Sequence, residues 1–456
     1  MKKFTYLFVV LLILSASCPI FAATTDDFVI TIDTTKGDGA NSFTIPTYPG
    51  EAYNYNVDCN NDGSTEATGV TGDFTCNYSS SGTYSIRIIG KDFPRIYFNN
   101  TGDKDKIVGI NQWGTVKWKS MEKAFMGCSN LNDTGGAATD NPNLSNVTSM
   151  KYMFYRASAF NQDIGNWDVS NVADMSYMFN KASAFNQDIT EWNVGNVTDM
   201  SYMFSSASEF DQKITKWNVS NVRNMYGMFW NAAKFNQDIG SWDVSNVTDM
   251  SYMFSGASKF DQNIGNWDVI NVTSMREMFS RATDFNQNIG NWNVSNVTDM
   301  HGMFSGASKF DQNIGNWNVS NVTDMSIMFW EAILFNQDIS NWNVSNVTNM
   351  TSMFSHASDF NQDLSKWNVE SVTNFNYMFS TITLSTKNYD ALLKSWSKQN
   401  LHSSMNFSGG NSKYCAVSAH NKLTSPDGFN WTITDGGLDT NCPKDITPVY
   451  QLLLEN

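Results

Sequence analysis

Four histidines are the imidazoles that the chain offers for acid–base or metal chemistry: His301, His356, His402 and His420. No two of them stand in the His-Glu-x-x-His spacing that binds zinc, and neither a Gly-x-Ser-x-Gly motif nor a Gly-Lys phosphate-binding loop occurs. With 44 Asp and Glu residues, carboxylate pairs at the separation of a glycosidase are too easily found to indicate one. We therefore expect no enzyme, no cofactor and no catalytic metal.

Tryptophan recurs every 25 residues through the middle of the chain, at Trp167, Trp192, Trp217, Trp242, Trp267, Trp292, Trp317, Trp342 and Trp367. The repeated unit reads W-[ND]-V-S-N-V-T-D-M-S-Y-M-F-S-x-A-S-x-F-[ND]-Q-x-I-G-N, and weaker copies precede it. A period of this length is typical of a solenoid in the leucine-rich-repeat range, whose stacked units bury one continuous core. We expect about eleven coils over residues 111–379.

Each coil has the spacing of a short helix after a short strand. Met175, Met178, Phe179 and Ala182 follow the i, i+3, i+4, i+7 pattern of a helix face, and residues 167–170 alternate between apolar and polar side chains as a strand does. We expect the tryptophans in the core. The glutamines and asparagines that recur in each coil, from Gln162 and Asn171 onward, are expected to form hydrogen-bonded ladders along the stack.

The coil positions whose residue differs from coil to coil are the best candidates for a binding surface. Trp230 and Trp330 stand where most coils have Ser, four coils apart, and tyrosines lie between the two methionines of several coils. Exposed aromatic residues are enriched in binding hot spots, whereas the alternative is that these rings only fill gaps beside a neighbouring coil. The candidate binding residues are Trp230, Trp330, Tyr177, Tyr202 and Tyr252.

The motifs W-D-V-S-N-V-T-D-M-S-Y-M-F and A-S-x-F-N-Q-D-I-G-N resemble the 25-residue repeat of BspA-like bacterial surface proteins and their lipoprotein relatives. The resemblance covers about residues 110–380. It implies a leucine-rich-repeat-like protein that is secreted or displayed on the surface, with adhesion or matrix binding as the expected activity. The Leu-Pro-x-Thr-Gly signal of wall-anchored members is missing from this sequence.

The first 22 residues have a positive start, a short apolar run and small residues before the expected cleavage point, which is the pattern of a secretory signal peptide. Cys18 offers an alternative, lipid anchoring, because the preceding residues loosely resemble a lipobox. The net charge of −15 argues against nucleic acid as a partner. We expect a secreted or cell-surface protein with no transmembrane helix in the mature chain.

Residues 23–110 contain short alternating strands separated by turn residues, which predicts an immunoglobulin-like β-sandwich. The segment also resembles the polycystic-kidney-disease-like module. Its Asp58, Asn60 and Asp62 are oxygen donors for a calcium ion, but the full EF-hand spacing is missing, so a hydrated turn is the alternative.

Residues 380–443 leave the repeat and are expected to cap the stack, with a helix over residues 388–396 and a short tail at 444–456. Short-range pairing in an oxidising compartment predicts the disulfides Cys59–Cys76 and Cys415–Cys442. Cys128 is left without a partner.

These observations together predict a bacterial repeat protein that binds a host or neighbouring-cell macromolecule, protein or glycan, through an extended solenoid surface. The alternative is a structural envelope spacer with no specific ligand.

Overall fold

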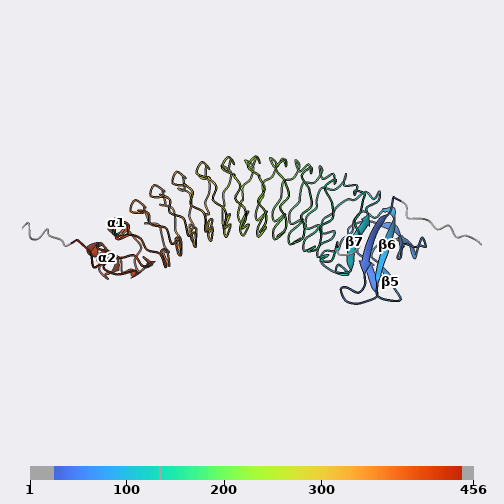
Figure 1. Cartoon of the computed structure of the whole chain (residues 1–456), viewed down its shortest axis with the longest axis horizontal. Coiled ribbons are helices and arrows are strands. Elements are labelled where there is room, and N and C mark those ends of the chain that lie inside the picture. Colours follow the sequence, from blue (N-terminus) through green and yellow to red (C-terminus); the bar gives the residue numbers. More distant parts are fainter. Residues whose placement is uncertain (1–24, 133–135, 444–456) are drawn as a thin grey trace, which may run out of the picture.

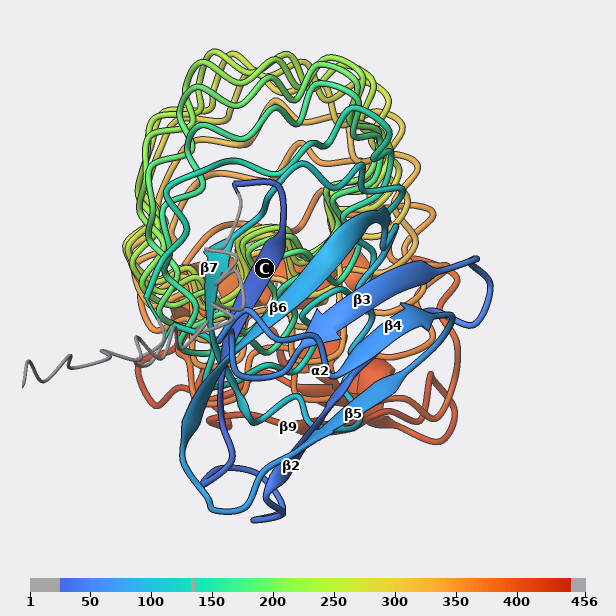
Figure 2. The ribbon, with the colours of Figure 1, turned by 90° about the vertical axis from the view of Figure 1, so that its right-hand side faces the viewer.

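The computed structural model describes residues 25–132 and 136–443. The expected signal peptide with Cys18 and the tail at 444–456 lie outside these residues and stay predictions. Figure 1 shows the described chain as a curved stack of coils, with a β-sheet unit at its N-terminal end and two helices at its C-terminal end. Viewed along the stack, the coils overlap as rings around a common interior (Figure 2).

The N-terminal unit consists of two open sheets. One has five strands in the order β4-β3-β6-β1-β7, and the other pairs β2 with β5. The bounds are β1 Phe28–Asp33, β2 Ser42–Ile45, β3 Asn54–Asp58, β4 Ala67–Val70, β5 Phe74–Asn77, β6 Thr83–Asp92 and β7 Ile107–Gln112. Its assignment to an immunoglobulin-like sandwich stays a prediction.

Residues 95–98 include an isoleucine, a tyrosine and a phenylalanine, which favour strands, but they form none. Instead Phe98 and Asn100 donate their backbone N–H groups to the carbonyls of Ala124 and Met126, at 3.1 and 2.9 Å. These residues therefore already stack on the following turn of chain as a coil does, and β7 takes the sheet edge beside β1.

The prediction of a helix in each coil is wrong. Residues 175–182 form successive tight turns, in which the N–H of Met178 bonds to the carbonyl of Met175 at 3.2 Å. Alternate residues bond to the next coil instead: the N–H of Tyr177 reaches Ser201 O at 2.9 Å and that of Phe179 reaches Met203 O at 2.9 Å. An α-helix would need i to i−4 bonds within one coil, and these donors are used between coils.

Two backbone positions in each coil exclude a helix directly. Tyr177 has φ +59° and Lys181 has φ +62°, which is the left-handed region that L-residues enter singly and not in helices. The strand expected at residues 167–170 is absent as well. The coils pair instead through isolated parallel bridges at one row of residues, of which Asp174 with Asp199 is typical.

The core is the part of the coil that the repeat pattern predicted correctly. Trp192 is 3% exposed, and its Nε1–H donates to Ile164 O of the preceding coil at 3.0 Å. The expected polar ladders are also present: Asn196 Nδ2 donates to Ser170 O at 2.7 Å, and Gln237 Nε2 donates to Asp211 Oδ1 at 2.8 Å. Each polar bond therefore joins neighbouring coils.

The C-terminal segment closes the stack with helix α1 (Thr386–Trp396), strand β8 (Asn406–Ser408), helix α2 (Val417–Thr424) and strand β9 (Thr432–Thr434). Helix α1 starts at the Ser385 N-cap and buries Tyr389, Leu392, Leu393 and Trp396, as its spacing predicted. Strand β8 continues the stack, because Phe379 N–H bonds to Ser408 O at 3.1 Å.

Both predicted disulfides, Cys59–Cys76 and Cys415–Cys442, are present. Cys128 carries a free thiol and is buried, and this burial raises the pKa of the thiol well above its usual range. A helix long and apolar enough to cross a membrane is not found in residues 25–132 or 136–443.

Candidate functional site

A row of tyrosines runs along one face of the first full coils. Tyr152, Tyr177 and Tyr202 occupy the same position of successive coils, and their rings stack with centroids 4.5 Å apart at each step. All three side chains are partly exposed. Burial against one another raises the pKa of Tyr177 to about 12, so its hydroxyl stays protonated at neutral pH. The stacked rings cover each other's faces and present their edges and hydroxyl groups outward.

The regular row is interrupted at Gly227. Glycine occupies the tyrosine position of this coil at φ +57°, and a Cβ atom there would lie 3.0 Å from the ring of Tyr202. Tyr226 and Trp230 flank the glycine on either side. The ring centroids of Tyr226 and Trp230 lie 5.0 and 6.0 Å from that of Tyr202 and 5.3 and 5.7 Å from that of Tyr252. In each pair the two ring planes are inclined to one another. The aromatic row, which we define as Tyr152, Tyr177, Tyr202, Tyr226, Trp230 and Tyr252, is thus continuous over five coils.

Two hollows flank the aromatic row and share Tyr177 and Tyr202. The first, of about 420 Å³, adds Ser201, Tyr226 and a polar edge that includes Arg223, Asn224 and Asp249. The second, of about 480 Å³, is lined by Tyr155, Tyr177, Asn180, Lys181, Tyr202, Ser205, Ser206, Trp230 and Asn231. The volumes of both hollows lie in the range of small-molecule sites. We name the second the Trp230 hollow.

Of the five predicted binding residues, the structure brings four together. Tyr177, Tyr202, Tyr252 and Trp230 belong to the aromatic row. Trp330 lies four coils further along, where its ring meets His356 edge-on at 6.3 Å. Its coil exposes Ile333 and Leu334, but the tyrosine position there is Ile327. Trp330 is therefore not part of the same site.

Residues that the sequence reasoning missed are Tyr155 and Asn180. Both stand at the coil position of Trp230, 75 and 50 residues earlier, so the same comparison between coils that picked out Trp230 would have found them. Asn180 is 5% exposed. Its Oδ1 is buried with no hydrogen-bond partner among the described residues.

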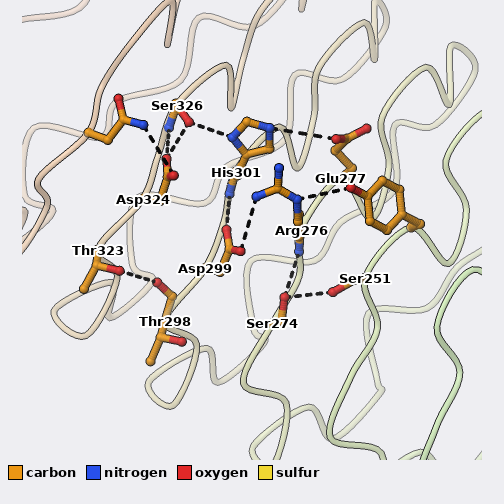
Figure 3. A network of polar contacts seen from close by, with 12 residues as sticks. Ser251, Ser274, Arg276, Glu277, Thr298, Asp299, His301, Thr323, Asp324 and Ser326 are labelled. Atoms are coloured by element: carbon orange, nitrogen blue, oxygen red, sulfur yellow. Dashed lines mark hydrogen bonds and ion pairs between the residues drawn. The ribbon is translucent and has the colours of Figure 1, made fainter. Parts of the chain in front are cut away.

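The aromatic row ends at a polar network, which Figure 3 shows. Arg276 Nε donates to the hydroxyl of Tyr252 at 3.1 Å. In the next coil, His301 Nδ1 lies 2.6 Å from Ser326 Oγ and its Nε2 lies 3.8 Å from Glu277 Oε1. Burial lowers the pKa of His301, and the charge of Arg276 adds to the effect. The network fills the surface that tyrosines cover in the earlier coils.

The candidate calcium residues lie at the end of β3 and in the loop that follows it. Asp58, Asp62 and Glu66, the last of which the sequence reasoning missed, bring ligand oxygens within 4.8 Å of one another. The loop already uses these groups: Asp58 Oδ2 accepts from Gly63 N–H at 3.0 Å and Glu66 Oε2 accepts from Cys59 N–H at 2.6 Å. Asn60 Nδ2 donates to Asp62 Oδ2 at 3.1 Å. The contacts fit the turn alternative, and calcium binding stays untested.

The family model described as "Mycoplasma protein of unknown function, DUF285" matches residues 94–215, 119–240, 209–316 and 303–417. The chain belongs to this family. The matched ranges include coils with and without the aromatic row, so membership of DUF285 describes the repeat and leaves the ligand open. The expected BspA-like repeat is supported at this level, whereas the polycystic-kidney-disease-like module stays a prediction. Comparison with curated proteins found no match, and comparison with solved structures found none.

Proposed function

We propose that this chain is a secreted or surface-displayed repeat protein that adheres to a macromolecule of a host or a neighbouring cell through the aromatic row. The observation that carries the proposal is that aromatic residues at the surface positions that vary between coils gather on one face of consecutive coils. The core does not need them, because the Trp, Met and Phe positions of every coil are already buried. Rings that remain partly exposed beside two hollows are available to a partner.

The extracellular location is supported by the two disulfides, since such bonds persist in oxidising compartments. The Cys59–Cys76 bond also links the sheet of β3 to that of β5. A disulfide between two antiparallel sheets is a feature of immunoglobulin domains, and it supports an immunoglobulin-like N-terminal module. Such a module would cover the apolar end of the stack.

A binding screen tests the adhesive role. Mature protein is presented to immobilised matrix proteins, glycans and intact cells, and we expect saturable binding to at least one class. Trp230→Ser should reduce that binding at least tenfold, whereas Trp330→Ser should leave it unchanged. Serine is the residue of most other coils at this position, so both variants keep the coil. Absence of saturable binding in all three classes would contradict the proposal.

The spacer alternative is favoured by the monotony of the core, and whole-coil deletions separate it from adhesion. Removal of residues 181–255 deletes three coils with most of the aromatic row, and removal of 281–355 deletes three coils without it. Adhesion predicts that only the first deletion abolishes binding. A spacer has no specific ligand, so it predicts no difference in binding between the two deletion variants. It also predicts that both deletions shorten the molecule equally.

A further inference from the structure

The Trp230 hollow is shaped by one position of the coil. In most coils this position is a buried serine, as at Ser205, Ser255, Ser280, Ser305 and Ser355. Beside the hollow it is aromatic instead, at Tyr155 and Trp230, which lie three coils apart. At about 4.8 Å per coil, the two rings bracket a stretch of about 14 Å. Between them stand Asn180 and the small Ser205, which form the floor of the hollow.

The floor holds an unsatisfied acceptor. Asn180 Oδ1 is buried and has no hydrogen-bond partner in the part of the chain that the structure describes. Leaving such an atom unpaired lowers the stability of the folded protein. The coil could avoid that cost, because serine serves at this position in the next coil. The amide torsion of asparagine is broad, so a ligand hydroxyl or N–H group in the hollow can supply the missing donor.

The bracketing rings differ from the stacked tyrosines in their orientation. Trp230 is inclined to Tyr202 by 49° and to Tyr252 by 44°, so neither ring covers its face by parallel stacking. A flat apolar face beside polar groups suits a ligand that has one apolar face and a hydroxyl-bearing edge. A pyranose ring has this form.

The cations around the hollow favour a negative charge on that ligand. Lys181 lines the hollow, and Arg156 lies over the ring of Tyr155, with its Cζ 5.4 Å from the centroid. Both are exposed. Within residues 25–132 and 136–443, no ion pair with a carboxylate is formed by either. The chain as a whole has a net charge of −15. Two cations that have no carboxylate partner and lie beside an aromatic pocket therefore favour the binding of an anion at this place.

We propose that the Trp230 hollow binds an acidic sugar residue of a glycan. The sugar ring lies against Trp230, one hydroxyl donates to Asn180 Oδ1, and the sugar carboxylate pairs with Lys181. This inference rests on the proposed adhesive function, for which it names the ligand class. Neighbouring sugars of the chain extend toward Tyr155.

Isothermal titration of the mature protein with a 1,4-linked hexuronic acid tetrasaccharide tests the pocket, with the neutral hexose tetrasaccharide as the matched ligand. We expect saturable binding of the acidic ligand and at least fivefold weaker binding of the neutral one. Asn180→Ser and Trp230→Ser should each weaken binding at least tenfold. Lys181→Ser should lower only the preference for the acidic ligand. Each variant installs the residue found at the same position of a neighbouring coil.

Trp330→Ser is the control and should titrate as the wild type does. Binding of neither tetrasaccharide, or binding that Asn180→Ser leaves unchanged, would overturn the saccharide pocket. If the protein still bound a matrix protein in a Trp230-dependent way, the adhesive function would stand and the ligand class would be wrong. If no macromolecule or cell bound while the acidic tetrasaccharide did, the pocket would stand and the adhesive function would be wrong.

Discussion

The coils of residues 150–255 and those of residues 275–380 share one interior but differ on one surface. In the first group, the left-handed position between the methionines is mostly tyrosine. In the second it is Glu277, Gly302, Ile327 and Ser352 before a single tyrosine returns at 377. The buried Trp, Val, Met and Phe rows continue through both groups, with Phe375 in place of a methionine near the end. The difference teaches that the core specifies the stack, while the surface rows are free to carry a site in one part of it.

The largest loss of stability should come from removing a core tryptophan, and it should be the same in both groups of coils. Trp217 and Trp317 are each 3% exposed, and the centroid of each ring lies 6.4 or 6.5 Å from that of the preceding tryptophan. Trp217→Ala and Trp317→Ala should each lower the free energy of unfolding by about 3–5 kcal/mol. Denaturant unfolding followed by circular dichroism measures this. A difference of more than about 1 kcal/mol between the two variants would show that the cores are not equivalent.

The interior could be predicted from the sequence because its chemistry is repeated in register. Trp, Met and Phe at fixed positions leave no doubt about burial. The path of the backbone was predicted wrongly, since Met175, Met178 and Phe179 have helical spacing, yet the donors of this segment bond to the next coil. A signal against the helix was present: glycine appears at the positions of Tyr177 and Lys181 in other coils, at Gly227 and Gly256, and both are left-handed.

The site was predictable only in part, for a different reason. Trp230 and three of the tyrosines were found because they break or extend a repeated position. Tyr226 stands one residue before the tyrosine position, which Gly227 holds. The sequence alone does not indicate that its ring still joins the aromatic row, because this depends on the space that the glycine leaves. Likewise, only the structure shows that Asn180 Oδ1 lacks a donor.

The tyrosine position offers a direct comparison of the two groups. Tyr202 and Tyr377 have similar backbone conformations, with φ of 55° and 59°, but Tyr377 is 64% exposed whereas Tyr202 contacts Tyr177, Tyr226 and Trp230. Tyr202→Ala should destabilise the protein by about 2 kcal/mol through lost ring contacts. Tyr377→Ala should cost less than about 0.5 kcal/mol. Equal costs in thermal unfolding would show that the aromatic row contributes no packing.

The second left-handed position should give a smaller, stabilising effect. Arg281 has φ +57°, and the same position holds glycine in both neighbouring coils, at Gly256 and Gly306. Relief of the left-handed strain by Arg281→Gly should stabilise the fold by about 1 kcal/mol relative to Arg281→Ala. The alanine variant is the control because it removes the same charge and keeps the strain. An alanine variant as stable as the glycine variant would contradict the assigned backbone conformation.

The smallest effect should come from acid and only from the second group, where His301 replaces the serine of Ser201 and Ser251. Its folded-state pKa is lowered by burial and by Arg276, so the unfolded chain takes up the proton first as the pH falls through about 6.5. The neutral ring is favoured despite Glu277, Asp299 and Asp324, which oppose the shift.

Thermal unfolding should therefore show wild type losing more stability between pH 7.5 and pH 5 than His301→Ser does. The aromatic row contains no histidine, so hydrogen exchange should find the acid-sensitive opening around residue 301 and not around the aromatic row. Opening centred on residues 177–230 would mean that the two surfaces are coupled through the shared core.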